Sequence, residues 1–142
     1  MPTPSTRPEV VISDKIHAAV SSLVVGTNMF LGPPKPWKIP TTAIPRNAVF
    51  VYSMLSFRPE QYIGTGEAFR DFRIYIFVRQ AQDQFATGQA LTRDIWVALN
   101  QANVTSSGYV GCLMAESDAQ YLGMDDVDDH RWVLTARLLY KG

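Results

Sequence analysis

The stretch from Arg70 to Ala102 constrains the fold most, because it predicts an amphipathic strand followed directly by an amphipathic helix. In the strand, two sets of side chains alternate, which is the period of two that places successive residues on opposite faces of a sheet. One set is Phe72, Ile74, Ile76 and Val78, and the other is Arg73, Tyr75, Phe77 and Arg79. The first set predicts a core face, whereas the second is neither a plain solvent face nor a plain core face.

The helix predicted after this strand carries one apolar stripe, which requires a sheet to pack on. Asp83 is its candidate N-cap or first-turn acid, and Asn103 with Gly108 marks its end. The stripe recurs at steps of three and four residues and consists of Phe85, Gly88, Leu91, Ile95, Ala98, Leu99 and Ala102. Gly88 costs about 1 kcal/mol of helix propensity against alanine, so it predicts a close approach of the helix to the sheet.

The length and composition fit one globular domain covering residues 1–142. Hydrophobic residues make up 46% and charged residues 18% of the chain, which excludes wholesale disorder. Thirteen basic residues balance thirteen acidic ones, so the basic excess of a dedicated nucleic-acid binder is missing. The first hundred positions hold ten basic and seven acidic residues and the remainder three and six, a polarity that suits head-to-tail self-association.

Compartment signals in the sequence point to synthesis in the cytoplasm. Cys112 is the single cysteine, so no disulfide within the chain is expected. The sequence has no pattern of a secretory leader and no apolar run of about 20 residues, so no membrane association is expected.

The rest of the chain predicts one more helix and four more strands. Residues 1–10 contain three prolines and predict a flexible or extended N-terminal arm. A helix is expected from Ser13, with Ser13 as N-cap, Gly26 as the stop and His17 as a solvated side chain on its outer side. Strands are expected at residues 27–31, 48–55, 109–115 and 130–140.

These elements predict an α+β fold, with a mixed or antiparallel sheet of about five strands and two helices packed on one face. The order is one helix, three strands, one helix and two strands. No helix remains for the other face of the sheet, where Tyr75, Phe77, Val133 and Leu139 are expected. A large apolar face left uncovered on a globular chain indicates an interface.

Two loops carry residues that could contact a partner or hold a ligand. The proline-rich stretch 35–45 contains Trp37, which could anchor a partner or fold back on the core. The stretch 116–129 is acidic, and its end with His130 could hold a hard cation. The spacing lacks the turn glycine and the distal glutamate of a calcium loop, so an acidic contact loop is the better interpretation. Its acids at this end are Asp125, Asp126, Asp128 and Asp129.

No catalytic, metal or cofactor site is predicted. His17 and His130 are the two histidines, and no glycine-flanked serine forms a nucleophile elbow. The sequence therefore offers few candidate residues for a catalytic triad. Gly64-Thr65-Gly66 lacks the preceding strand, the following helix and the Lys-Ser/Thr pair of a phosphate-binding loop. The chain is therefore not expected to be an enzyme.

The order of these segments resembles the tail terminator and neck proteins of long-tailed bacteriophages, a family also described as minor capsid or minor tail proteins. The likeness spans nearly the whole chain without a short diagnostic motif. It lies in Gly26–Gly32, Ile44–Tyr52, the Phe72–Arg79 strand with its glutamine-rich entry to the next helix, and Arg131–Leu138. The resemblance implies a structural virion protein made in the host cytoplasm. It implies a ring, usually of six subunits, that caps the tail tube and joins the tail to the head connector.

The partners expected from this resemblance are further copies of the chain, the tail tube protein and the head connector or neck proteins. Arg70, Arg73 and Arg79 could line a path for DNA, or merely solvate the strand or pair with acids. The candidate contact residues are Trp37, Arg73, Tyr75, Phe77, Arg79, Asp125, Asp126, Asp128, Asp129 and Arg131. Three alternatives stay open: a metal-binding or nucleic-acid-processing enzyme using the loop 116–130, another head-tail completion or minor capsid protein, and a non-viral peptide-binding module built on Trp37.

Overall fold

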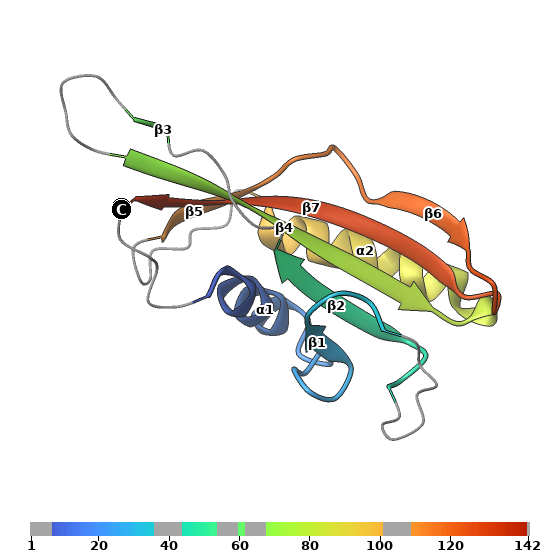
Figure 1. The fold of residues 1–142 in the computed structure, drawn as a ribbon. Coiled ribbons are helices and arrows are strands. Elements are labelled where there is room, and N and C mark those ends of the chain that lie inside the picture. Colours follow the sequence, from blue (N-terminus) through green and yellow to red (C-terminus); the bar gives the residue numbers. More distant parts are fainter. Residues whose placement is uncertain (1–6, 36–43, 54–59, 62–67, 101–108, 142) are drawn as a thin grey trace.

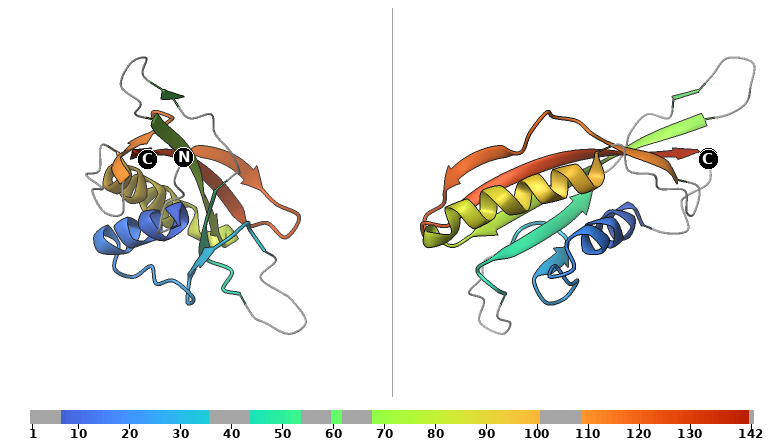
Figure 2. Two further views of the ribbon diagram at one scale, coloured as in Figure 1. Left: turned by 60° about the vertical axis from the view of Figure 1, so that its left-hand side comes forward. Right: turned by 180° about the vertical axis from the view of Figure 1, so that it is seen from behind.

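The computed structural model describes residues 7–35, 44–53, 60–61, 68–100 and 109–141, with the backbone alone for 60–61, 68–71 and 141. Both helices cover the same face of a single sheet, so the predicted α+β architecture is confirmed (Figures 1 and 2). The helices are α1 (Pro8–Ala19), the short 3-10 helix η1 (Gln82–Gln84) and α2 (Phe85–Leu99). The strands are β1 (Met29–Leu31), β2 (Ala48–Ser53), β3 (Glu60–Gln61), β4 (Ala68–Gln80), β5 (Tyr109–Met114), β6 (Gln120–Met124) and β7 (His130–Lys141).

The sheet is built on the long antiparallel pair of β4 and β7, which stay in register from Phe69↔Lys141 to Gln80↔His130. The strand order is β1-β2-β4-β7-β5, with β3 beside β4 and β6 beside β7. The sheet is mixed, as predicted, because β1 and β2 run parallel whereas the other pairs are antiparallel. β6 pairs with the N-terminal part of β7 and β5 with its C-terminal part, so the two strands follow one another along one side of β7.

The core lies between the sheet and the two helices, where the alternation in β4 predicts it. Ile74, Ile76 and Val78 are fully buried on this face. β7 adds Trp132, Leu134, Ala136 and Leu138, and the helices add Ile12, Ile16, Ile95 and Leu99. Each aliphatic side chain of this size stabilises the fold by about 1.5–3 kcal/mol when it leaves water, so this layer supplies most of the hydrophobic stabilisation.

Gly88 lies where α2 rests on β7, and the close approach predicted from its place in the apolar stripe is confirmed. A Cβ atom added to Gly88 would lie 2.4 Å from two ring atoms of Trp132. The indole is fully buried, and its N–H donates to the side-chain oxygen of Gln89 at 2.8 Å. The glycine therefore lets the helix backbone contact the indole directly, which offsets its low helix propensity.

The first helix begins and ends earlier than predicted. α1 starts at Pro8, within the stretch expected to be an extended arm, and stops at Ala19 well before Gly26. Proline suits the first helical turn because the N–H that it lacks would have no partner there. Ser13 is not the N-cap, since its hydroxyl donates to the carbonyl of Val10 inside the helix at 2.8 Å. Residues 1–6 lie outside the described part of the chain.

The second helix also differs from the prediction at its ends. Asp83 lies in the first turn of η1 and is exposed, but no side chain caps either η1 or α2. Instead, the backbone N–H of Ala81, the residue before η1, donates to the side-chain oxygen of Asn47 at 2.8 Å. A residue from another segment therefore supplies the hydrogen-bond acceptor at the start of η1. α2 ends at Leu99, and the expected stop near Asn103 falls outside the described residues.

Two strands appear that the sequence did not predict, β3 and β6, in addition to the five that it did. β6 falls inside the stretch 116–129 that was expected to be a loop. A bulge interrupts the register between Tyr121 and Gly123, where Gly123 adopts a φ of 82°. The residues of β6 therefore do not alternate regularly between the two faces, and the sequence lacks the period of two that identifies a strand. Among the described helices, none is long and apolar enough to cross a membrane.

Candidate functional site

The face of the sheet opposite the helices carries the second set of side chains of β4. Tyr75 and Phe77 are half-buried there, and Val133 and Leu139 from β7 share the face and are also half-buried. Both described helices pack on the other face, so the expectation that these four side chains lack a helix above them is met. We call this surface the helix-free face.

One end of the helix-free face is filled from within the chain. Phe50 is fully buried between Phe30 and Phe77, with ring centroids 5.7 Å and 6.3 Å away respectively. Ile44 and Ala48 complete this second apolar cluster. A cavity of about 280 Å³ lies beside the cluster, lined by Phe30, Leu31, Gly32, Pro33, Lys35, Ile44 and Phe50. Phe77 is therefore partly a core residue, which weakens the prediction that it contacts a partner.

The middle of the helix-free face is more open. Tyr52 of β2 stacks on Tyr75 with 5.5 Å between ring centroids. Burial, and then the neighbouring Tyr75 hydroxyl, raise the pKa of Tyr52, so the Tyr52 phenol stays neutral at physiological pH. Arg73 is exposed next to them and lies opposite Arg137 in the register of β4 and β7. This part of the face thus combines aromatic rings with basic groups.

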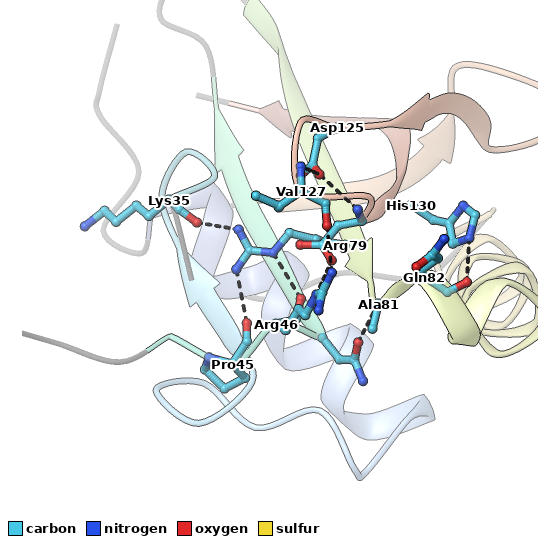
Figure 3. Close-up of polar contacts among 11 residues, drawn as sticks. Lys35, Pro45, Arg46, Arg79, Ala81, Gln82, Asp125, Val127 and His130 are labelled. Carbon is cyan, nitrogen blue, oxygen red and sulfur yellow. Dashed lines mark hydrogen bonds and ion pairs between the residues drawn. The ribbon is translucent and has the colours of Figure 1, made fainter. Parts of the chain in front are cut away.

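Arg79 is not on the open surface, contrary to its prediction as a contact or DNA-path residue. It is 5% exposed, and its guanidinium donates to three backbone carbonyls, those of Lys35, Pro45 and Arg46 (Figure 3). The Arg46 and Pro45 bonds measure 3.0 Å and 3.1 Å. Burial lowers the pKa of Arg79 from its usual value, and the carboxylate of Asp129 opposes this shift. Arg79 therefore fastens the segments on both sides of residues 36–43 to the end of β4.

We call Arg79, together with the three carbonyls that it bonds, the clamp. Arg46 links the clamp to the turn between β6 and β7. Its Nε donates to Asp129, and its terminal nitrogen donates to the carbonyl of Val127 at 2.7 Å. Asp129 is fully buried. The side chain of Asp125 closes the same turn by accepting the backbone N–H groups of Val127 and Asp129 at 3.0 Å and 2.9 Å. Asp125 and Asp129 therefore hold the turn together, a role that the sequence did not indicate.

Arg131 and His130 at the start of β7 are also engaged inside the chain. The guanidinium of Arg131 donates to the carbonyls of Leu122 and Met124, at 3.2 Å and 3.3 Å, and thereby covers the backbone of β6 at its bulge. One ring nitrogen of His130 lies 3.0 Å from the carbonyl of Gln82. The other lies 2.7 Å from the hydroxyl of Tyr121.

The acidic stretch and His130 do not converge on a metal site. Figure 3 shows the imidazole of His130 turned towards Gln82 and away from Asp125. Within the part of the chain that the structure describes, no three histidine, cysteine or acidic side chains group as metal ligands. Cys112 is buried on β5, beside β7 in the sheet, and burial raises its pKa to about 12, so its thiol stays protonated.

Apart from Trp37 and from Phe77, which packs on the second apolar cluster, the predicted contact residues fall into two groups. Arg79, Asp125, Asp129 and Arg131 are engaged within the chain by the contacts described above. Arg73, Asp126 and Asp128 are exposed, and Tyr75 is half-buried. Trp37, like the side chain of Arg70, lies outside the described residues.

Comparison with known proteins gives a likeness to a solved structure. No model of a protein family matches the sequence, and no curated protein matches it. The chain is similar to a chain in the solved structure of the virion of a native gene transfer agent particle, with a TM-score of 0.63. The likeness covers 95% of both chains at 18% sequence identity. At this identity the likeness establishes a shared fold.

Proposed function

We propose that this chain is a structural protein of a phage-like virion, and that it acts there as a tail terminator. In this role six copies form a ring that caps the tail tube and joins it to the head connector. The observation that carries the proposal is the fold shared over 95% of both chains with a component of a virion particle. This support is an analogy of fold, and the chain's own residues support the proposal through the helix-free face.

The helix-free face supports an assembling protein rather than a solitary one. Tyr75, Val133 and Leu139 are half-buried on a face that carries no described helix. Surfaces that keep apolar side chains partly in water are typical of sites that a partner covers. In a ring each copy contacts the next through two different patches, so one chain must carry both.

The metal-dependent enzyme that the acidic stretch left open is less well supported. Asp125 and Asp129 are used to build the β6–β7 turn, and both ring nitrogens of His130 have partners. A hydrolytic cation site needs carboxylate oxygens that converge on one point. Calorimetric titration with Mg²⁺, Mn²⁺ and Ca²⁺ is expected to give no stoichiometric binding, and tight binding of one ion per chain would revive this alternative.

The ring is tested by measuring mass. We expect light scattering on the purified chain to show a rise from the monomer mass towards six times that mass as the protein concentration increases, with rings visible by negative-stain electron microscopy. The tail tube protein is expected to shift this association to lower concentration, because a bound partner favours the assembled state. A strictly monomeric mass at every concentration, with the tail tube protein present, would refute the proposal.

The exposed acids of the β6–β7 turn give a second test. Changing Asp126 and Asp128 together to lysine is expected to weaken assembly at least about tenfold while the far-UV circular dichroism spectrum stays the same. Asp128 has a φ of 62°, where lysine costs about 1 kcal/mol more than a short polar residue. The pair Asp126→Lys with Asp128→Asn is therefore the companion variant. Normal assembly of both variants would exclude a contact role for these acids.

A further inference from the structure

Three segments from distant parts of the sequence meet at one end of the sheet. They are residues 44–47 before β2, the turn between β4 and η1, and the β6–β7 turn. The register brings them together, because Arg79 lies opposite the first residue of β2 and Gln80 lies opposite the first residue of β7. Figure 3 shows that polar contacts also join these segments to one another. This end of the molecule is therefore held by side-chain contacts as well as by the strand ladder.

Arg46 takes part in two of these contacts at once. Its backbone carbonyl accepts the Nε–H of Arg79 at 3.0 Å, so it belongs to the clamp. Its side chain, which is 38% exposed, donates to Asp129 and to the carbonyl of Val127 in the β6–β7 turn. These bonds use different atoms of Arg46, so a single residue joins the clamp to the turn.

Asp129 makes this connection sensitive to the loss of one contact. Its side chain is fully buried, and within the described part of the chain the guanidinium of Arg46 is its hydrogen-bond donor. The second carboxylate oxygen has no donor among the described residues. Burial lowers the pKa of Arg79 and the charge of Asp129 opposes this shift, so the acid also favours the charged clamp. A buried charge that loses its partner is strongly destabilising, so without Arg46 the turn is expected to open and let the carboxylate reach water.

The turn between β4 and η1 is bonded to both of the other segments. The backbone N–H of Ala81 donates to the side-chain oxygen of Asn47, the residue after Arg46, at 2.8 Å. The carbonyl of Gln82 lies 3.0 Å from a ring nitrogen of His130, which directly follows the β6–β7 turn. A movement of residues 44–47 away from the β6–β7 turn would therefore disturb this third segment as well.

From these contacts we infer that Arg46 is a coupling residue, which makes the clamp and the β6–β7 turn open and close together. The clamp fastens the segments on both sides of residues 36–43, whereas the turn carries the exposed Asp126 that is proposed above as a contact. A partner that binds and stabilises the turn is then expected to stabilise the clamp, and the effect is reciprocal. The coupling is a property of the single chain, so it holds whether or not the chain forms a ring.

Hydrogen exchange followed by NMR on the purified chain tests this coupling. Arg46→Met removes the guanidinium but keeps the length of the side chain and the carbonyl that Arg79 bonds. The Nε–H of Arg79 donates to that carbonyl and not to the group removed. It is nevertheless expected to exchange at least about tenfold faster, because the clamp opens whenever the turn opens. The same change at an exposed arginine of β4, Arg73→Met, is the matched control and is expected to leave this rate unchanged.

The reverse variant is Arg79→Lys, which weakens the clamp while it keeps the positive charge near Asp129. It is measured at the backbone N–H groups of Val127 and Asp129, which donate to Asp125 within the turn. These groups are expected to exchange several-fold faster, because coupling acts equally in both directions. When Arg46 is already methionine, Arg79→Lys is expected to change their exchange by less than about twofold, since the two parts are then uncoupled.

The backbone N–H groups of Ile76 and Leu134, in the middle of β4 and β7, are expected to keep their wild-type exchange, which shows that the opening is local. An unchanged Nε–H of Arg79 in Arg46→Met would show that the clamp and the turn open independently and would overturn the inference. Equal acceleration at Ile76 and Leu134 would also overturn it, because the opening would then be global. Neither result bears on the proposed ring, whose failure would instead be seen as a monomeric mass by light scattering.

Discussion

Replacing Arg79 with alanine is expected to lower the free energy of unfolding by about 2–4 kcal/mol. The guanidinium is 5% exposed and supplies hydrogen bonds to the carbonyls of Lys35, Pro45 and Arg46. Without it these three carbonyls lose the donor that ties them to the end of β4, and the buried space of the side chain is left empty. Each hydrogen bond contributes about 0.5–1.5 kcal/mol, so the three together account for most of the expected loss.

The matched control is Arg73→Ala on the same strand. Arg73 is exposed, so its loss is expected to change the free energy of unfolding by less than about 0.5 kcal/mol. Arg79→Lys is expected to fall between the two, because an ammonium group cannot reach three carbonyls with the planar fork of a guanidinium. Urea unfolding followed by tryptophan fluorescence measures all three variants. Equal stability of the Arg79 and Arg73 variants would show that the clamp contributes nothing to the fold.

The parts of the fold that follow a local period were predictable. The alternation along Phe72–Arg79 identified the buried face of β4, and the stripe along α2 identified the side that packs on β7. Both patterns arise within a few neighbouring residues, where side-chain direction follows directly from backbone geometry. The count of two helices for one sheet then left one face without a helix, and in the described part of the chain both helices do pack on the other face.

The clamp could not be predicted, because its partners are distant in the sequence. Arg79 bonds to residues 33 to 44 positions away, and Arg46 bonds to residues 81 and 83 positions away. An arginine in an alternating strand carries the same local pattern whether it faces solvent or a set of carbonyls. The acids of the β6–β7 turn pose the same difficulty, since Asp125 and Asp129 are buried or bonded while Asp126 between them is exposed.

The acids of the β6–β7 turn have two different roles, so variants of each must be interpreted differently. A cluster of acids in the sequence suggested one contact loop, but the structure separates residues that build the hairpin from those that extend from it. In the second group, Asp126 can be changed without disturbing the hairpin, whereas Asp128 needs a short polar replacement because of its φ of 62°. Assembly defects in variants of Asp125 or Asp129 would therefore report loss of the turn, whereas defects in Asp126 variants report a contact.

Replacing Gly88 with alanine is expected to lower the free energy of unfolding by about 2–3 kcal/mol, even though alanine is the better helix former by about 1 kcal/mol. The added Cβ would lie 2.4 Å from the ring of Trp132, and that ring is fully buried and held by a hydrogen bond to Gln89. The indole cannot move aside without opening the core. Overpacking therefore outweighs the gain in helix propensity.

A double-mutant cycle attributes this cost to the indole. With Trp132 changed to leucine, the space above Gly88 opens, and Gly88→Ala is then expected to be neutral or to stabilise by up to about 1 kcal/mol. Ala90→Gly at an exposed position of the same helix measures the propensity term alone. Thermal and urea unfolding give the coupling free energy, expected to exceed about 2 kcal/mol. An equal cost of Gly88→Ala in both backgrounds would mean that the helix backbone, and not its contact with Trp132, requires glycine at this position.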